Sequence, residues 1–309
     1  MLAGRLDPDL EELCRAHFRV IDPSGDRSQG PPLRGAAGGV SQVRALVTSG
    51  GQGASAAQID SLPALEIIAS FGVGVDSIDL EAARRRGVIV TNTPDVLSDA
   101  VADLAIGLLL AVSRRICQAD RFVRAGQWPS GGFSLGRGLA GRRCGIVGMG
   151  AIGRCVATRA LAFGLEVAYS GPHEKLGLPY RFYADLVELA RASDFLILTL
   201  PGGSSTRGLI DASVLEALGR EGVLINVARG SVVDEAALVR MLSSGELGGA
   251  GLDVFEHEPH APPELFALEN VVLLPHLGSA TVETRLAMAR LTFENLQAHF
   301  SGRPPLTPV

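Results

Sequence analysis

The sequence contains only four cysteines, and none of them lies in a C-x-x-C pair. Zinc sites and dithiol redox sites use that spacing, so neither kind of site is expected, and no other metal is predicted. The scattered residues Cys14, Cys117, Cys144 and Cys155 are typical of small buried hydrophobic side chains in a reducing compartment. A disulfide framework is therefore not expected.

Long apolar runs and blocks of like charge are also missing. No run reaches the roughly 18 apolar residues of a membrane helix, and the first residues lack the basic and apolar regions of a signal peptide. The formal net charge is −5, and no run of five like charges occurs. We therefore expect a cytoplasmic protein whose partners are neither nucleic acid nor membrane.

The chain does contain enough apolar sequence for two domains, with 309 residues of which 47% are hydrophobic. Short apolar runs alternate with helical patterns, which predicts parallel sheets covered by helices. Little sequence precedes the first predicted helix, and only Leu2 and Ala3 stand where a first strand is expected. In the first part the pattern predicts helices over 7–16 and 80–86, strands over 18–22, 45–48, 65–71 and 88–91, and a loop over 23–41.

The second part begins with a long apolar helix predicted over 94–115. Six strands are then predicted, which is the strand number of a complete doubly wound sheet. These strands are expected over 144–147, 166–170, 195–200, 223–227, 251–255 and 271–274, with helices over 154–163, 184–191, 214–218, 234–243 and 279–300.

A G-x-G-x-x-G motif, residues 148–153, lies directly between the first of these strands and its helix. In this context the first glycine, Gly148, permits a tight turn, and Gly150 lets a pyrophosphate approach the backbone. Gly153 lets helix and strand pack closely, and the phosphates bind the N–H groups at the helix start. The motif therefore predicts a dinucleotide-binding site.

Three charged or titratable residues follow the ends of predicted strands, namely Arg229, Glu258 and His276. Doubly wound folds bind ligands at that edge of the sheet. One of the three could clamp a carboxylate, one could donate a proton, and one could be the acid that keeps the donor charged. Each residue alone could equally be a surface ion pair or a solvated loop side chain, and their common location favours a site.

The sequence resembles the D-isomer-specific 2-hydroxyacid dehydrogenases, and within them the glyoxylate and hydroxypyruvate reductase branch. The resemblance covers nearly the whole chain. It depends on the segments 70–76 (SFGVGVD), 145–153, 226–235 (NVARGSVVDE), 251–259 (GLDVFEHEP) and 274–281 (LPHLGSAT).

The resemblance implies an α/β protein with two Rossmann-like, doubly wound parallel-sheet domains and a cleft between them. Residues 1–98 with 279–309 would form the substrate domain, and residues 99–278 the dinucleotide-binding domain. A homodimer is expected. The implied reaction is NAD(P)H-dependent reduction of a small 2-keto acid, of the glyoxylate or hydroxypyruvate type, to the D-2-hydroxy acid.

The resemblance also implies roles for individual residues. Arg229 would bind the carboxylate and carbonyl of the substrate, His276 would be the general acid, and Glu258 would keep the imidazole cationic. Glu258 is chosen over Glu256 because it directly precedes a proline. Backbone N–H groups of Val73 and Gly74 would bind the substrate carboxylate. The cofactor would contact Gly148, Gly150, Ala151, Ile152, Gly153, Ser170, Gly171, Pro172, Pro201, Val227, Ala228, Asp253 and Gly278, with Asp253 accepting from the carboxamide.

Residue 170 bears on the choice of cofactor. NAD-specific folds place an acidic residue at the end of the second strand, where this chain has Ser170. No carboxylate there repels a 2′-phosphate, which favours NADP, with NAD as the alternative. Relatives that prefer NADP often carry Arg after the serine, whereas this chain has Gly171. Arg154, His173 or Lys175 would then have to supply the positive charge.

The resemblance includes relatives with other functions. The related formate dehydrogenases carry Gln where Glu258 stands, which argues against that branch. Some relatives are nucleotide-binding, redox-sensing corepressors that keep the same three residues, and others reduce bulkier 2-keto acids. Turnover of short 2-keto acids with NADPH distinguishes an enzyme from a sensor.

Overall fold

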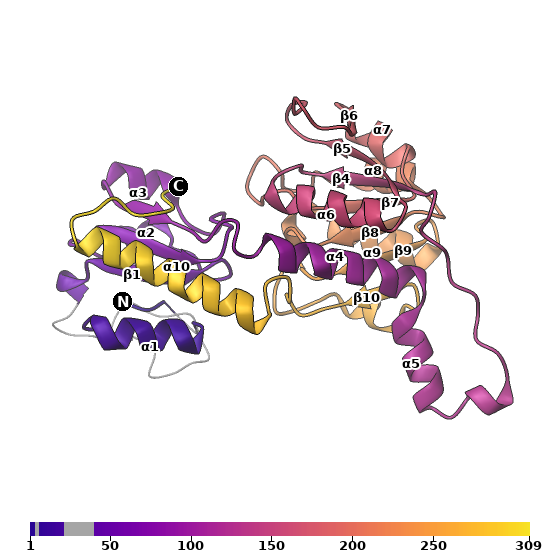
Figure 1. The fold of residues 1–309 in the computed structure, drawn as a ribbon, viewed down its shortest axis with the longest axis horizontal. Helices are drawn as coiled ribbons and strands as arrows, with labels where there is room; N and C mark the ends of the chain where they lie inside the picture. Colours follow the sequence, from indigo (N-terminus) through magenta and orange to yellow (C-terminus); the bar gives the residue numbers. More distant parts are fainter. Residues whose placement is uncertain (4–5, 22–39) are drawn as a thin grey trace. The chain divides into compact units, whose positions relative to one another are not determined.

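A computed structural model describes residues 1–3, 6–21 and 40–309. The chain forms two compact units, Met1–Leu97 with Ser279–Val309, and Ser98–Gly278. Each unit is built on a parallel sheet with helices packed against it (Figure 1). The expected α/β fold with two parallel-sheet domains is confirmed.

The first unit contains a three-stranded parallel sheet in the order β1-β2-β3. Its central strand β2 is buried at all five positions, as its apolar sequence IIASF predicts for a strand covered on both faces. Leu2 adds a parallel bridge to Val47 at one edge, and Pro308 an antiparallel bridge to Thr91 at the other. The elements are β1 (Ala45–Ser49), β2 (Ile67–Phe71), β3 (Ile89–Thr91), α1 (Pro8–His17), α2 (Ala56–Asp60), α3 (Leu80–Arg85) and α10 (Val282–Phe300).

The loops that follow β1 and β2 are tied to each other at the carboxyl edge of this sheet. The Ser77 hydroxyl donates to the Gly50 carbonyl at 2.8 Å, and the Ala54 N–H donates to the Ser77 carbonyl at 3.1 Å. Gly53 has φ +63, and a Cβ there would lie 1.9 Å from the Ser77 oxygen, so only glycine fits. This contact fixes the loop that carries Val73 and Gly74.

The second unit contains a seven-stranded sheet in the order β10-β9-β8-β7-β4-β5-β6, with every pair parallel. Its strands are β4 (Arg143–Val147), β5 (Glu166–Ser170), β6 (Arg181–Tyr183), β7 (Phe195–Leu198), β8 (Val223–Asn226), β9 (Gly249–Leu252) and β10 (Val271–Leu273). Its helices are α4 (Ser98–Ser113), α5 (Ile116–Arg124), α6 (Ala151–Ala162), α7 (Leu186–Arg191), α8 (Ala212–Leu218) and α9 (Glu235–Ser244).

The direction of winding reverses next to β4. From β4 the chain proceeds through β5 to β6 on one side and then returns to β7 on the other. Helices α4 and α6 pack on each other, and α7 and α8 form a second pair (Figure 1). Parallel sheets bind ligands outside the carboxyl ends of the strands at such a reversal, which here lies between β4 and β7.

The predicted elements are mostly correct, and the errors are local. The second unit has seven strands rather than six, because Arg181–Tyr183 forms a short edge strand. Residues Phe18–Ile21 form no strand, while 22–39, and with them most of the predicted loop, lie outside the described residues. Helix α2 was not predicted, since its five residues are too few for a periodic pattern.

The long helix predicted over 94–115 is wrong at both ends. It begins at Ser98 after Asp95, whose φ is +65, and ends at Ser113. Arg115 then adopts a left-handed conformation with φ 55, and a separate helix, α5, follows. A non-glycine residue with positive φ ends a helix but leaves no trace in a hydrophobic pattern.

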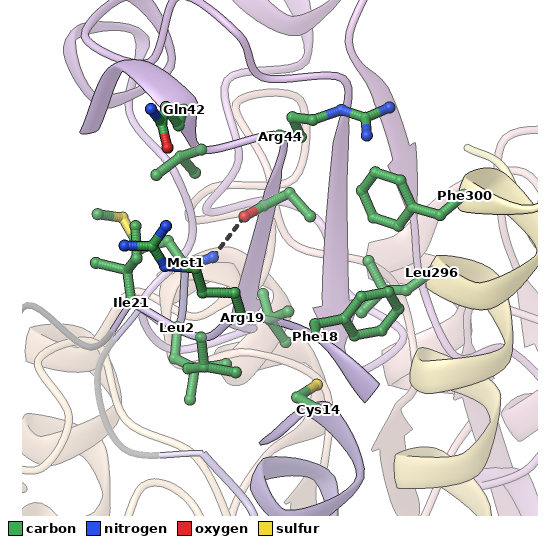
Figure 2. A pocket seen from close by; sticks show the side chains of 14 residues that line it. Met1, Leu2, Cys14, Phe18, Arg19, Ile21, Gln42, Arg44, Leu296 and Phe300 are labelled. Atoms are coloured by element: carbon green, nitrogen blue, oxygen red, sulfur yellow. Dashed lines mark hydrogen bonds between the residues drawn. The ribbon is translucent and has the colours of Figure 1, made fainter. Parts of the chain in front are cut away.

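A cavity of about 400 Å³ lies within the first unit (Figure 2). It is bordered by Met1, Phe18 and Arg44, with Leu296 and Phe300 from α10 on one side. Arg44 and Ala45 stand at the amino end of β1, whereas the predicted substrate loop follows the carboxyl end of β2. Within the first unit, the cavity is therefore at the opposite end of the strands from the predicted substrate loop.

The four cysteines are free thiols. Burial raises the pKa of Cys14 to about 11 and that of Cys144 to about 12, so both remain protonated thiols near neutral pH. Cys117 and Cys155 are only half-buried. Within residues 1–3, 6–21 and 40–309, no helix is long and apolar enough to cross a membrane.

Candidate active site

The glycine turn after β4 has the geometry that a dinucleotide requires. Gly148 has φ +96, and a Cβ at Gly153 would lie 2.2 Å from the Gly148 oxygen, so the first and third glycines are needed for the turn and for packing. A Cβ at Gly150, in contrast, would meet no atom within 4 Å. Gly150 caps α6 without a side-chain hydrogen bond, which leaves its first N–H groups available to an anion.

Ser170 lies beside this turn. It is the last residue of β5, pairs with Val147 and is buried, and its carbonyl accepts the Gly148 N–H at 2.9 Å. The following loop returns to the same strand, because the Lys175 N–H donates to the Tyr169 hydroxyl at 2.7 Å. The place where NAD-specific folds carry an acid is therefore occupied by a serine and a short, anchored loop.

The sequence-predicted site residues of the second unit share one edge of its sheet. Because all seven strands are parallel, their carboxyl ends lie together, and each predicted residue is at or just beyond one of them. Gly148, Gly150, Ala151, Ile152 and Gly153 follow β4; Ser170, Gly171 and Pro172 end or follow β5; Pro201 follows β7; Val227, Ala228 and Arg229 follow β8; Asp253 and Glu258 follow β9; and His276 and Gly278 follow β10.

His276 and Glu258 form a direct pair, with Nδ1 of His276 2.7 Å from Oε2 of Glu258. The other carboxylate oxygen accepts the Phe255 N–H at 3.1 Å, so both oxygens are engaged. Burial alone would raise the pKa of Glu258, but the hydrogen bond and charge of His276, the Phe255 N–H and the charge of Arg229 together lower it. The Glu258 carboxylate is thus ionised at neutral pH and accepts a hydrogen bond from the imidazole.

The imidazole is only partly covered, with 45% of the His276 side chain exposed. A cavity of about 360 Å³ opens beside His276 and Glu258 and is otherwise lined mainly by apolar residues, among them Phe255 and Phe266. One nitrogen of the ring is held by Glu258, and the exposed ring leaves the other able to meet a ligand.

Arg229 is presented by a turn that Asn226 organises. Asn226 ends β8 and is 1% exposed; its Nδ2 donates to the Arg229 carbonyl at 3.0 Å, and its Oδ1 accepts the Ala228 N–H at 3.0 Å. The Arg229 guanidinium donates to the Ala228 carbonyl at 2.7 Å. No role for Asn226 was predicted, although a polar residue at the end of the buried strand VLIN is a signal of one.

The turn after β8 and the loop after β9 pack backbone against backbone. A Cβ at Gly230 would lie 1.9 Å from the Phe255 carbonyl carbon and 2.2 Å from the Glu256 nitrogen. The Glu256 N–H also donates to Glu235 Oε1 at 3.1 Å. Arg229 and Glu258 are therefore positioned as one assembly.

We expect Gly230→Ala to lower the free energy of unfolding by about 3 kcal/mol or more, because the added methyl group overlaps backbone that no rotamer change can move. Chemical denaturation of both proteins measures the change. Gly107→Ala is the matched control, since a Cβ at Gly107 meets nothing within 4 Å and Gly107 lies inside α4. Equal stability of the Gly230→Ala and Gly107→Ala proteins would contradict the close approach.

Asp253 is the most deeply buried of the predicted site residues with a charged side chain, at 1% exposure. Its Oδ1 accepts the Leu277 N–H at 2.6 Å, and its Oδ2 accepts the Gly278 N–H at 2.8 Å. Burial raises the pKa of Asp253, although these two N–H groups and the charge of His276 act in the opposite direction. Both oxygens thus bind the segment that carries the histidine.

Val73 and Gly74 belong to the first unit and follow β2. The loop is fixed by Asn92, whose Nδ2 donates to the Val73 carbonyl at 2.8 Å, and by the Thr93 N–H, which donates to the Gly72 carbonyl at 2.9 Å. The N–H groups of Val73 and Gly74 have no hydrogen-bond partner in the described part of the chain. They are available to bind an anion.

The glycine turn, the strand reversal and the His–Glu pair are the features of an α/β oxidoreductase that uses a dinucleotide. Residues 106–278 match the family model described as D-isomer specific 2-hydroxyacid dehydrogenase, NAD binding domain. The chain belongs to the D-isomer-specific 2-hydroxyacid dehydrogenases, as the sequence analysis predicted.

Individual relatives point to one branch of this family. The chain is 55% identical to hydroxyphenylpyruvate reductase of Plectranthus scutellarioides and 53% identical to glyoxylate/hydroxypyruvate reductase A of Arabidopsis thaliana, each over 86% of this chain and 85% of the relative. The crystal structure of an NADPH-dependent glyoxylate/hydroxypyruvate reductase from Sinorhizobium meliloti, in complex with NADP and malonate, is 44% identical. It superimposes with a TM-score of 0.92 and covers 100% of this chain and 95% of that one.

Proposed function

We propose that the protein reduces small 2-keto acids of the glyoxylate or hydroxypyruvate type to D-2-hydroxy acids with NADPH. The observation that carries this proposal is the His276–Glu258 pair at the same sheet edge as the glycine turn. The relatives named as glyoxylate/hydroxypyruvate reductases support it. A proton donor held beside a dinucleotide site is what carbonyl reduction needs.

The proposed mechanism assigns one task to each side chain. Bound NADPH supplies the hydride. Arg229 binds the substrate carboxylate and carbonyl oxygen through its planar set of N–H donors. The N–H groups of Val73 and Gly74 are proposed as the substrate-binding groups of the first unit. His276 gives its proton to the carbonyl oxygen, and Glu258 stabilises the imidazolium beforehand. In this proposal residues 1–98 with 279–309 bind substrate, and residues 99–278 bind the dinucleotide.

The glycine turn fits the proposed cofactor. The open space at Gly150 and the uncapped start of α6 suit a pyrophosphate. Ala151, Ile152, Pro201, Val227, Ala228, Asp253 and Gly278 are proposed as further contacts, with Ala228 near the nicotinamide ring.

The preference for NADPH over NADH is inferred from residues 170–175. Ser170 offers a hydroxyl where an acid would repel a 2′-phosphate, and Gly171 and Pro172 would line the same site. The loop contains Lys175, the only lysine of the chain. We expect a higher kcat/KM with NADPH than with NADH and a reversed preference in Ser170→Asp. A preference of the wild-type protein for NADH would refute this part of the proposal.

A substrate panel tests the activity itself. NADPH oxidation is followed with glyoxylate, hydroxypyruvate and hydroxyphenylpyruvate, the last because one relative is named as a reductase of that compound. We expect turnover of at least one of them. Tight NADPH binding without turnover of any would instead favour a nucleotide sensor of the corepressor kind.

We expect Glu258→Gln to lower kcat for reduction and to remove the acid limb of its pH profile. In the wild-type protein that limb reflects protonation of Glu258, whose pKa lies below its ordinary value, and a glutamine cannot titrate. The pH profile of kcat measures the change. Glu256→Gln is the control, because Glu256 is two residues away but pairs with Arg207 at 2.8 Å. Superimposable profiles for Glu258→Gln and wild type would argue against the pairing.

We also propose a homodimer formed through α5 and residues 125–138. In this segment Val123, Trp128 and Leu135 are 52%, 67% and 95% exposed, an unusual density of uncovered apolar side chains. The segment has its own internal contact, since the rings of Phe122 and Phe133 lie 5.4 Å apart. It projects from the helices of its unit (Figure 1). Light scattering of wild type and Leu135→Glu tests this, with a dimer and a monomer expected respectively.

A further inference from the structure

The three residues at the carboxyl end of β10 all bind one aspartate. The His276 N–H donates to the Asp253 backbone carbonyl at 2.9 Å, and the Leu277 and Gly278 N–H groups donate to its two carboxylate oxygens at 2.6 and 2.8 Å. The Asp253 N–H in turn donates to the Asn226 carbonyl at 3.0 Å. Asp253 thereby links the ends of β8, β9 and β10.

The conformation of His276 requires an explanation. Its φ is +56, in the left-handed region that side chains other than glycine seldom adopt. Such a conformation persists only where the surroundings determine it. Here the surroundings are Asp253, whose three acceptors fix the N–H directions of residues 276–278.

We infer that Asp253 is a positioning residue that turns His276 into its left-handed conformation and so directs the imidazole toward Glu258 and the substrate. The inference rests on the proposed reductase function, in which His276 is the proton donor. Positioning of His276 explains why residue 253 carries a buried carboxylate rather than an amide or a hydroxyl. Only a carboxylate offers two acceptor oxygens to two adjacent N–H groups, whereas an asparagine would turn an NH₂ group toward one of them.

The first test compares Asp253→Asn with the wild-type protein. A displacement of the imidazole by about 1 Å costs about 100-fold in rate, so we expect kcat to fall about 100-fold. The KM for the 2-keto acid should stay within about threefold. A kcat within about threefold of the wild-type value, with only the Kd for NADPH raised, would overturn the inference, because Asp253 would then act on the cofactor alone.

A double-mutant cycle separates positioning of His276 from a general effect on the fold. If Asp253 acts through His276, then adding Asp253→Asn to His276→Ala should change the remaining rate by less than about threefold. If Asp253→Asn lowers the rate by the same factor in the His276→Ala protein as in the wild-type protein, the inference is overturned. Asp185→Asn is the matched control, because Asp185 also accepts two backbone N–H groups, those of Val187 and Glu188, but does so at the start of α7. This control should leave kcat unchanged.

Amide hydrogen exchange tests the geometry without relying on activity. In the wild-type protein the amides of Leu277 and Gly278 should exchange slowly, although the Leu277 residue itself is 40% exposed. Unprotected amides at 277 and 278 would overturn the inference even where Asp253→Asn fails to fold. Slow exchange in a protein without turnover of any 2-keto acid would refute the proposed function and leave the hydrogen-bonded turn supported.

Discussion

Replacing His276 by alanine is expected to lower kcat for 2-keto acid reduction by about 10²–10⁴-fold, the usual contribution of a positioned general acid. In the proposed mechanism the carbonyl oxygen receives its proton from the imidazole, and Nδ1 of that ring lies 2.7 Å from Glu258. Alanine removes the donor and leaves the glycine turn untouched. The Kd for NADPH should therefore stay close to the wild-type value.

The matched control for this variant is His257→Ala. His257 is exposed and directly precedes Glu258 in the chain, and its carbonyl accepts the His260 N–H at 2.8 Å. Truncating this side chain leaves that backbone bond in place, so its kcat should match that of the wild-type protein. An unchanged kcat in His276→Ala would remove His276 from the role of proton donor.

The edge of the sheet on which the site residues lie was predictable from the sequence. Apolar runs such as Leu224–Ile225 and Leu196–Leu198 mark buried parallel strands, and in a parallel sheet all carboxyl ends share one edge. The residues that follow these runs are therefore predicted to lie at one edge of the sheet. Arg229, Glu258 and His276 are among them. The glycine turn was predictable because each of its three glycines has its own steric reason: the tight turn, the approach of the pyrophosphate, and the packing of helix against strand.

The connections that hold these residues in place were not predictable. A hydrophobic pattern carries no information on the left-handed φ of His276 or on the two N–H groups that Asp253 accepts. The contact of Gly230 with Phe255 joins residues that are distant in sequence, and it depends on how two loops cross. Such features arise from tertiary packing, which periodicity does not record.

The same distinction explains the errors in the predicted elements. The edge strand Arg181–Tyr183 has only three residues, carries a charge and pairs on one side alone, so its pattern is no stronger than that of a loop. The break between α4 and α5 depends on the backbone of Arg115, a residue with good helix propensity. Sequence patterns are strong where an element is buried on both faces. The missed edge strand and the missed break between α4 and α5 both lie where burial is partial.

Replacing Arg229 by alanine is expected to lower kcat/KM for the 2-keto acid by about 10³-fold, the scale of losing one partner of a hydrogen-bonded charge pair. The substrate carboxylate would lose its planar pair of N–H donors, and the carbonyl would lose its orientation relative to His276. A second consequence follows from the charge of Arg229, which contributes to the low pKa of Glu258. Without it Glu258 gains a proton at higher pH, so the acid limb of the kcat profile should move to higher pH.

Arg229→Lys separates these two consequences. Lysine keeps the positive charge but not the bidentate geometry, so the acid limb should stay near its wild-type position while kcat/KM remains well below the wild-type value. Arg207→Ala is the control for loss of an arginine nearby, because Arg207 is bound to Glu256 at 2.8 Å and its side chain is 64% exposed. Steady-state kinetics across pH measures all four proteins. Equal kcat/KM for Arg229→Ala and Arg207→Ala would mean that Arg229 does not bind the substrate carboxylate, and full recovery by lysine would mean that charge alone suffices there.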